Sequence, residues 1–486
     1  MTSEGVERRE GFGGPEHGHG GLDALVIVAG QAGLAAGYHL RRAGLSFAIL
    51  EAGEEPGGSW PGYYESLTLF SPSRYSGLPG MPFPGPPDRY PTRDEVTAYL
   101  RRYAEVFGLP VLTGEPVLRA ERAGAGFRVL TAGGEYWART LIAATGSFNK
   151  PHRPRFPNQG AFRGRILHAA EYRNAEPFRG KRVVVVGAGN SAVQIAHELA
   201  AVARTTLATR APLRFGPQTI LGRDVHFWLS ATGLDRLPLG RYLDVSEPAG
   251  VVDNGMYAAA VAAGRPDRRP VFSRFTEEGV VWDDGEEAVD AVVLATGYRP
   301  NLDYLRPLGV LREDGRPDQR AGIARCVPGL YFVGLPFQTS FASATLRGVG
   351  PDATLVVSQA RRFVARHTPA TAESPDSFRA KMARAAGLKG CDPIAFGHTH
   401  KPWRRVVESV GCVNTGSVGK PKDGDWRAGY ALIKADEEIA EVEFVRVEYD
   451  LERATDGIYR SGIRDEFAEQ LRAGRTPRPA EPAEVP

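Results

Sequence analysis

The chain contains the same local pattern twice: an apolar run rich in valine and isoleucine, a glycine-rich turn, and a helical stretch. The first copy occupies residues 22–42 and the second occupies residues 181–203. Continuous Val and Ile runs before a glycine turn are typical of buried strands in a parallel sheet. The repeat therefore predicts an α/β protein built from two parallel-sheet domains.

The first glycine turn has the residues of a dinucleotide-binding site. Gly30 and Gly33 let the backbone approach a pyrophosphate at the start of the following helix, where free N–H groups and the helix dipole favour negative charge. Glu51 follows Gly33 by eighteen residues, which is the expected spacing of an acid that accepts the ribose hydroxyls of an adenosine. The alternative interpretation is a tight turn that binds no ligand.

Val28 departs from this pattern, because it stands where the fingerprint has its first glycine. If the turn requires a positive φ, a β-branched residue costs about 1–2 kcal/mol there and points a side chain toward the phosphates. We therefore expect a reduced affinity for the first dinucleotide. In the extreme case the chain would be a nucleotide-binding protein without catalysis.

The second turn and the start of its helix consist of small residues: Gly187, Gly189, Asn190, Ser191 and Ala192. The alanine stands in place of the third glycine, which is an accepted variant. The next strand leads into Arg210 and has no acid at its end. An arginine there can pair with a 2′-phosphate, which favours NADPH over NADH. Arg204 is a second candidate, and the alternative for Arg210 is a solvated surface side chain.

Further motifs resemble those of flavin-containing monooxygenases. The signature FxGxxxHxxxY, followed by a basic residue, is met by Phe162, Gly164, His168, Tyr172 and Arg173. Residues 57–60 resemble the GGxW segment of that family, residues 294–298 its LATGY linker, and residues 144–146 its first crossing between domains. Short bacterial members, including enzymes of arsenic-resistance operons, are most similar, and residues 343–350 resemble that group. The resemblance covers about residues 22–366.

The resemblance implies two Rossmann-like, three-layer dinucleotide-binding domains. The FAD-binding domain would comprise residues 22–150 and 290–366, with an NADPH-binding domain inserted at residues 151–289. Phe162, Gly164, His168 and Tyr172 would hold the hinge between the domains, and no catalytic residue is identified. The residues expected to contact FAD or NADPH are Gly30, Gly33, Glu51, Gly58, Trp60, Thr145, Gly146, Gly187, Gly189, Asn190, Ser191, Ala192, Arg210, Thr296, Gly297 and Gly334.

The implied reaction is the oxygenation of a small molecule. In that family NADPH passes a hydride to FAD, and the reduced flavin reacts with O₂ to give a flavin hydroperoxide that transfers oxygen. Animal-type members carry an asparagine near the flavin, and the matching stretch here, residues 66–73, contains none. An NADPH oxidase or reductase that transfers no oxygen is therefore the first alternative.

A change in composition indicates a separate C-terminal module. Residues 367–376 read as a linker, and residues 377–474 resemble part of the calcineurin-like metallophosphoesterases, so that we expect a partial α/β module. His398 and His400, in the segment GHTH, correspond to metal ligands of those enzymes. The upstream motifs that complete a dimetal centre do not appear in order. Residues 224–226 have the letters of one of them, DxH, but they fall inside the NADPH-binding domain. A metal-dependent phosphoesterase is the second alternative.

The composition excludes several other classes of protein. The formal net charge of +3 gives no electrostatic reason to expect a nucleic-acid partner, and no stretch reaches the roughly 18 apolar residues that span a bilayer. Three widely spaced cysteines suit a reducing compartment, so we expect a cytoplasmic location. Residues 1–21 and 475–486 are expected to be disordered. The partners are a small-molecule substrate and O₂, and a homodimer is left open.

Overall fold

The computed structural model describes residues 21–238 and 250–367 of the chain. In the C-terminal part it describes residues 394–396, 403–407, 410–414, 427–435, 440–460 and 466–473. The chain divides into two compact units, residues 1–367 and residues 368–486, and each is described by itself.

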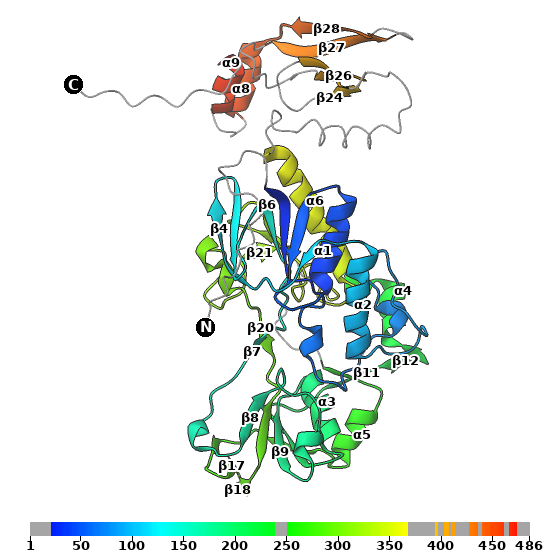
Figure 1. Ribbon diagram of the computed structural model, residues 1–486, viewed down its shortest axis with the longest axis vertical. Coiled ribbons are helices and arrows are strands. Elements are labelled where there is room, and N and C mark those ends of the chain that lie inside the picture. Colours follow the sequence, from blue (N-terminus) through cyan, green and yellow to red (C-terminus); the bar gives the residue numbers. More distant parts are fainter. Residues whose placement is uncertain are drawn as a thin grey trace, which may run out of the picture. The chain divides into compact units, whose positions relative to one another are not determined.

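The first sheet has nine strands and a parallel centre (Figure 1). β1 is parallel to β2 on one side and to β6 on the other, and β23 is parallel to β6. β4 and β5 form an antiparallel meander with β6. The strands are β1 (Leu22–Ile27), β2 (Phe47–Leu50), β3 (Val111–Leu112), β4 (Val117–Ala123), β5 (Gly126–Thr131), β6 (Glu135–Ala143), β21 (Gln319–Arg320), β22 (Ile323–Ala324) and β23 (Leu330–Phe332).

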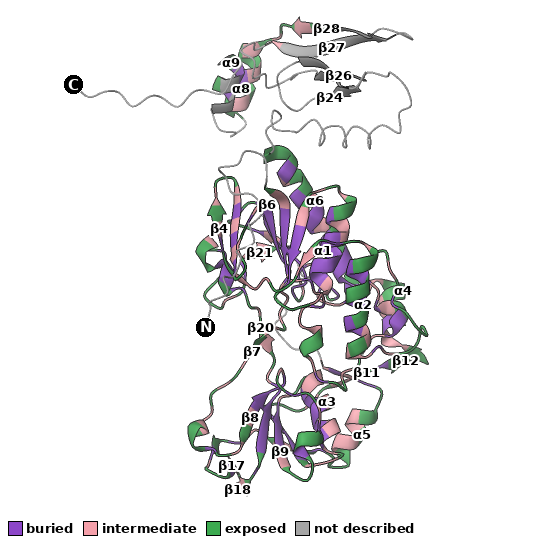
Figure 2. Cartoon of the chain, viewed as in Figure 1, coloured by how far each residue is buried: buried purple, intermediate pink, exposed green. Residues whose placement is uncertain are grey.

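Three helices cover one face of this sheet: α1 (Gln31–Arg42), α2 (Arg93–Val106) and α6 (Val349–His367). Buried residues of α1 and α6 pack against one another and against β1 and β6. Figure 2 shows in purple where these helices and strands are buried. α2 begins with a complete capping box, in which Thr92 accepts from the Glu95 backbone N–H and the Glu95 side chain accepts from that of Thr92. Such a box satisfies two backbone donors and fixes where the helix begins.

The second sheet has five strands, in the order β15, β10, β9, β19, β8, and every neighbouring pair is parallel. The strands are β8 (Arg165–His168), β9 (Arg182–Val186), β10 (Arg204–Thr209), β15 (Asp267–Pro270) and β19 (Ala291–Leu294). α3 (Asn190–Leu199) packs on one face, where α5 (Met256–Ala262) contacts it. An antiparallel sheet of β16 (Arg274–Phe275), β17 (Gly279–Trp282) and β18 (Gly285–Ala288) covers the other face.

The boundary expected at residue 290 is displaced in the structure. β19 belongs to the second sheet, where it lies between β9 and β8, and not to the first. All four of its residues are buried, because a central parallel strand is covered on both faces. The chain therefore returns toward the first sheet only at β20 (Tyr298–Arg299), which pairs antiparallel with β7 (Lys150–Pro151).

An insertion between β10 and β15 extends from the second sheet. Its elements are β11 (Phe215–Pro217), β12 (Thr219–Ile220), β13 (Arg223–Asp224), α4 (Val225–Thr232), η5 (Leu234–Arg236) and β14 (Val251–Asp253). The Gln218 side chain donates to the Phe70 carbonyl oxygen (3.0 Å), and Tyr90 donates to Asp224 (2.5 Å). The insertion therefore docks on the loop that precedes α2.

In the C-terminal unit, β26 (Val410–Asn414) lies between β24 (Ile394–Phe396), which is parallel to it, and β25 (Trp403–Val407), which is antiparallel. β27 (Ala428–Ala435) and β28 (Ala440–Val447) form a hairpin. Two helices follow the hairpin in the chain, α8 (Leu451–Arg460) and α9 (Glu466–Ala473). The predicted linker and disordered ends lie almost wholly outside the described residues. Within the described parts of the chain, every helix is too short or too polar to span a bilayer.

Candidate functional site

The start of α1 has unsatisfied backbone donors. Its N-cap residue is Gly30, no side chain caps it, and its first turn contains no acidic residue. α2, by contrast, is fully capped. A helix N-terminus without a cap leaves its N–H groups and its dipole available to an anion. The position of Gly30 therefore suits a pyrophosphate, as the sequence predicts.

Close backbone approach explains the glycines around this helix start. A Cβ atom on Gly33 would lie 1.9 Å from the Val28 carbonyl oxygen, and one on Gly58 would lie 2.9 Å from the Gly30 Cα atom. A Cβ atom on Gly334 would lie 2.6 Å from the Ala32 Cβ atom. These glycines make a surface of bare backbone against α1, which fits a bound dinucleotide such as FAD.

Val28 has the positive φ that makes a β-branched residue unfavourable in this turn. Its φ is 80°, in the left-handed region that a β-branched residue rarely adopts. Its Cγ1 atom lies 3.7 Å from the ideal Cβ position of Gly30 and 3.2 Å from that of Gly58. The side chain thus adjoins both glycines beside the expected pyrophosphate position.

Glu51 is held in place by two backbone donors. It is 3% exposed, its Oε2 atom accepts from the Ala29 N–H (2.8 Å), and its Oε1 atom accepts from the Gly53 N–H (3.0 Å). The carboxylate therefore lies at the carboxyl end of β2, beside the glycine turn. A carboxylate fixed in this position can accept the hydroxyl groups of an adenosine ribose.

Sequence reasoning missed the side chain that connects Trp60 to the rest of this site. The Gln31 Oε1 atom accepts from Trp60 Nε1 (2.9 Å), and Gln31 Nε2 donates to the Ala344 carbonyl oxygen (2.7 Å). Gln31 is the first residue of α1, so the GGxW segment and residues 343–350 both meet at this helix start. The proximity of position 31 to residue 344 has no local signal, because the two are 313 residues apart.

The second glycine turn repeats the arrangement of the first. Gly187 has φ 150°, and a Cβ atom there would lie 2.3 Å from the Ala295 carbonyl oxygen. Gly189 is the N-cap of α3, without a side-chain cap and without an acid in the first turn. Asn190 and Ser191 begin the helix, and the Asn190 side chain accepts from the Val252 N–H (3.2 Å). Ala192 is buried against the sheet.

Cationic side chains lie at the carboxyl end of β10. Arg210 is exposed and follows Thr209, whose hydroxyl accepts from Arg268 Nε (3.0 Å). Burial lowers the pKa of His152, and the positive charges of Arg299 and Arg210 lower it further, so these three groups share one region. No pattern in the sequence indicated that Arg268, Arg299 and His152 lie in the same region as Arg210.

Arg204 was the wrong alternative. It begins β10 and pairs with Arg182 at the start of β9, whereas the glycine turn follows the other end of β9. A strand of six residues is about 17 Å long at 3.3 Å per residue, so the two ends are far apart. Arg204 therefore lies at the amino ends of the parallel strands, and the nucleotide-binding turn lies at their carboxyl ends.

His168 joins the two chain crossings. It is fully buried, its Nε2 atom lies 3.0 Å from the Gly297 carbonyl oxygen, and its Nδ1 atom accepts from the Ala170 N–H (3.1 Å). These partners assign the neutral tautomer with the proton on Nε2. Burial lowers the pKa of His168, although the hydrogen bond with Gly297 acts in the opposite direction. The Tyr298 ring lies edge-on to it at 5.0 Å.

The other signature residues also serve packing. Phe162 lies in the core beneath the antiparallel sheet, and a Cβ atom on Gly164 would lie 2.7 Å from the Asp290 carbonyl oxygen. Tyr172 is fully buried, which raises the pKa of its hydroxyl. Thr296 donates to the His152 carbonyl oxygen (2.5 Å). Thr145 and Gly146 follow β6, and the Thr145 carbonyl oxygen accepts from Asn149 (3.1 Å).

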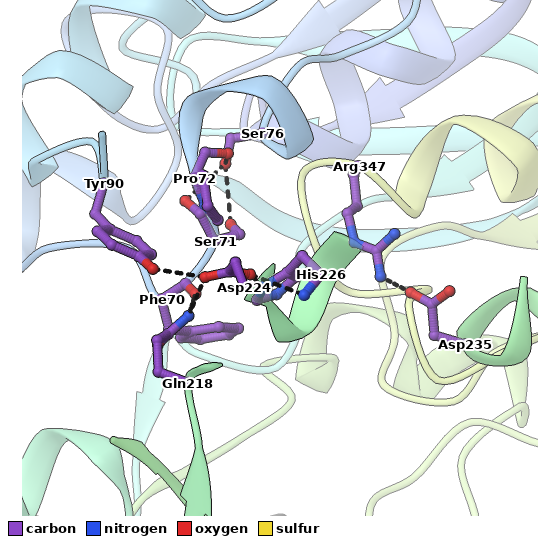
Figure 3. A network of polar contacts seen from close by, with 10 residues as sticks. All are labelled: Phe70, Ser71, Pro72, Ser76, Tyr90, Gln218, Asp224, His226, Asp235 and Arg347. Carbon is purple, nitrogen blue, oxygen red and sulfur yellow. Dashed lines mark hydrogen bonds and ion pairs between the residues drawn. The ribbon is translucent and has the colours of Figure 1, made fainter. Parts of the chain in front are cut away.

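A buried polar network, which the sequence did not reveal, joins the insertion to the first domain (Figure 3). Tyr90, Gln218 and His226 all donate to the Asp224 carboxylate. Nearby, Asp235 and Arg347 form an ion pair in which both side chains are almost entirely buried. The described residues contain no group of three or more His, Cys, Asp or Glu side chains placed to hold a metal ion. His398 and His400 lie outside the described residues.

Comparison with known proteins identifies the family. The sequence profile of the pyridine nucleotide-disulphide oxidoreductases matches residues 25–334. An uncharacterized CzcO-like oxidoreductase of Geobacillus kaustophilus is 33% identical over 340 residues, which are 69% of this chain and 97% of the relative. Indole-3-pyruvate monooxygenase YUCCA4 of Oryza sativa subsp. japonica is 32% identical over 69% of this chain and 86% of that protein.

A solved structure gives the same result. The flavin-containing monooxygenase of Stenotrophomonas maltophilia is 36% identical, has a TM-score of 0.62, and covers 71% of this chain and 99% of its own. The expected cofactors, FAD and NADPH, agree with these comparisons. The Stenotrophomonas protein is a flavin-containing monooxygenase, and a steroid monooxygenase with 22% identity and a TM-score of 0.52 was solved bound to NADP. The chain therefore belongs to the pyridine nucleotide-disulphide oxidoreductase family and is a flavin-dependent oxidoreductase.

Proposed function

We propose that this protein is a monooxygenase that binds FAD at its first glycine turn, is reduced by NADPH at its second, and oxygenates a small molecule with O₂. One observation carries the proposal: two uncapped helix starts follow parallel strands, one with Glu51 beside it and the other with Arg210. Glu51 suits the unmodified ribose of FAD, whereas Arg210 suits the 2′-phosphate of NADPH.

The protein supplies binding and geometry, and the flavin supplies the redox chemistry when it is bound. Gly30, Gly33 and Gly58 would hold the pyrophosphate against α1, and Glu51 would hold the ribose. At the second turn, Gly189 would present the start of α3 to NADPH. The exposed Arg210, with Arg299 in the same region, would neutralise its extra phosphate.

Contacts between the two domains would keep the nucleotides in register. The Tyr64 hydroxyl donates to Gln194 of α3 (2.5 Å), and the Ser66 hydroxyl donates to Glu198 of the same helix (2.6 Å). His168 ties the end of β8 to Gly297 in the return crossing. A fixed distance between the nucleotide turns is what hydride transfer from one ring to the other requires.

The absorption spectrum of the purified protein, before and after NADPH is added without oxygen, tests the proposal. We expect visible flavin bands that bleach with NADPH, and oxygenated product equivalent to the NADPH consumed once a substrate and air are present. A colourless protein that cannot be reconstituted with FAD would contradict the proposal. It would leave a nucleotide-binding protein without flavin chemistry.

An NADPH oxidase or reductase is the alternative within the same class of enzyme. It is favoured by residues 66–73, which lack the asparagine of animal-type monooxygenases. This activity would release one H₂O₂ for each NADPH consumed, or reduce an acceptor other than O₂, and no substrate would lower the peroxide yield. The phosphoesterase alternative rests on His398 and His400 alone. It would require Mn²⁺-dependent hydrolysis of a nitrophenyl phosphodiester that is lost in the His400→Ala variant.

A further inference from the structure

The insertion presents a histidine oriented by a carboxylate. The Asp224 Oδ1 atom accepts from His226 Nδ1 and from the His226 backbone N–H, both at 2.8 Å (Figure 3). The Oδ2 atom of Asp224 accepts from the Tyr90 hydroxyl (2.5 Å) and from Gln218 Nε2 (2.6 Å). An ionised Asp224 has only acceptors, so the proton on this side of the imidazole resides on Nδ1.

Two aromatic rings fix the plane of the imidazole. The ring centroid of His226 is 6.0 Å from that of Phe70 and 6.2 Å from that of Tyr75, with interplanar angles of 26° and 25°. His226 is 5% exposed, and its Nε2 atom accepts or donates no hydrogen bond among the described residues. The ring is thus held by Asp224, adjoins two aromatic rings, and leaves one nitrogen for another partner.

This histidine lies beside segments that adjoin the expected FAD site. Phe70 and Tyr75 follow the GGxW segment, in which Trp60 contacts Gln31 at the start of α1. The Ala342 N–H donates to the Asp235 carbonyl oxygen (3.0 Å), and Arg347 pairs with the Asp235 side chain. α4, which carries His226, contacts the loop after the FAD glycines, and η5, which follows α4, contacts residues 342–347 through Asp235. Both elements come from the NADPH-binding side.

We propose that His226 donates the proton that is consumed when O₂ is reduced at this site, and that Asp224 is a positioning residue for it. This inference rests on the proposed function. In oxygenation, NADPH, H⁺, O₂ and substrate give NADP⁺, oxygenated product and water. Without a substrate, NADPH, H⁺ and O₂ give NADP⁺ and H₂O₂. One proton is consumed in both cases: the Nε2–H bond breaks, an O–H bond forms, and solvent protonates the imidazole again.

The charged and titratable groups around His226 are few. Asp224 precedes it, Tyr90 lies ahead of α2, Tyr75 lies in the loop, and the Asp235–Arg347 pair lies beyond α4. Burial alone raises the pKa of Asp224, but hydrogen bonds from His226 and Tyr90 outweigh it and hold that pKa below its ordinary value. Asp224 thus stays ionised and holds the proton on His226 Nδ1.

The His226→Asn variant separates proton donation from structure, because the asparagine amide keeps a donor for Asp224 and removes Nε2. The NADPH-reduced protein is mixed with aerated buffer, and the return of oxidised flavin and of H₂O₂ is followed from pH 6 to 9. We expect reoxidation of the variant to be about 100-fold slower. We also expect the reoxidation rate of the variant to depend less on pH than that of the wild type. Free imidazole should restore part of the rate.

Two controls separate the outcomes. Anaerobic bleaching by NADPH should be unchanged in His226→Asn, and His39→Asn, on the far part of α1, should leave both reactions unchanged. If the wild-type protein binds no FAD or is not reduced by NADPH, the proposed function fails. If it is reduced normally and His226→Asn reoxidises like the wild type at every pH, only the role of His226 is overturned.

A measurement without turnover tests the same geometry. In ¹⁵N-histidine NMR spectra, the His226 signal is assigned by its loss in His226→Asn. We expect its neutral form to carry the proton on Nδ1, and we expect Asp224→Asn to reduce that preference. A neutral form protonated on Nε2, or an Nε2 atom that takes up no proton down to pH 6, would overturn the proposal.

Discussion

The carbonyl oxygen of Val28 lies 1.9 Å from the position that a Cβ atom on Gly33 would occupy. The Gly33→Ala substitution should therefore displace α1 from the end of β1, at a cost of about 1–3 kcal/mol in the free energy of unfolding. FAD should be lost from the purified protein. Urea denaturation and the flavin content measure the two effects. Gly62→Ala is the matched control, since nothing lies within 4 Å of that Cβ position.

The Val28→Gly substitution should strengthen FAD binding. Glycine adopts a φ of 80° without the cost of about 1–2 kcal/mol that valine bears, and it removes a methyl group next to Gly58. The dissociation constant for FAD should fall by about 5- to 30-fold, as measured by fluorescence titration of the apoprotein. Leu221→Gly provides a control, because Leu221 also has a positive φ (48°) but is 85% exposed and lies in the insertion. An equal gain in both variants would contradict a local effect on the FAD site.

Arg210→Ala should change the choice of nicotinamide cofactor. Loss of a contact to the 2′-phosphate should raise KM for NADPH by about 10- to 100-fold, corresponding to roughly 1.5–3 kcal/mol for a charge-assisted contact. KM for NADH should change little. Arg204→Ala alters the opposite end of the same strand and should leave both values unchanged. Steady-state kinetics with both cofactors would refute the assignment if the two KM values rose together.

His168 should make the protein less stable in acid. Its folded-state pKa is lower than that of an ordinary histidine (6.5), so below about pH 6.5 the unfolded chain binds a proton that the folded chain does not. Its full contribution is present above that pH. As the pH falls below about 6.5, the free energy of unfolding decreases by up to about 1.4 kcal/mol per pH unit until the folded-state pKa is reached.

Urea denaturation between pH 5 and 8 measures this dependence. His168→Gln keeps an N–H donor for Gly297 and removes the titration, so its stability should fall less steeply in acid than that of the wild type. His39 and His152 also have lowered pKa values and act in the same direction, so some pH dependence should remain. Identical slopes for the two proteins would show that His168 does not titrate within this range.

A chain that ends at residue 367 should retain flavin binding and reduction by NADPH. Residues 1–367 form one compact unit, which contains both glycine turns, Glu51 and Arg210. The Geobacillus relative is matched over 97% of its length by 69% of this chain, so it has no counterpart to the remainder. The truncated protein should show the same visible spectrum and the same anaerobic bleaching as the full chain. Loss of FAD on truncation would show that the second unit contributes to the site.

The two nucleotide-binding units could be predicted because their signals are local. A buried parallel strand, a glycine turn and an uncapped helix are encoded within about twenty residues, and the spacing to Glu51 is short. The pattern alone left open whether the turn requires a positive φ at Val28, and the structure shows that it does. The error at residue 290 has the opposite cause. A short apolar run such as β19 predicts a buried strand, but it does not indicate which of the two parallel sheets that strand joins.

By itself, the sequence determined the parallel sheets, the glycine turns and the identity of the charged residue after each second strand, because strand burial and helix starts depend on neighbours along the chain. Only the tertiary structure decided which distant groups share a site. Gln31 meets Ala344, Arg347 meets Asp235, and the insertion places His226 beside two rings from the loop before α2. The physical reason is that buried charges and donors must find partners wherever packing brings the chain together.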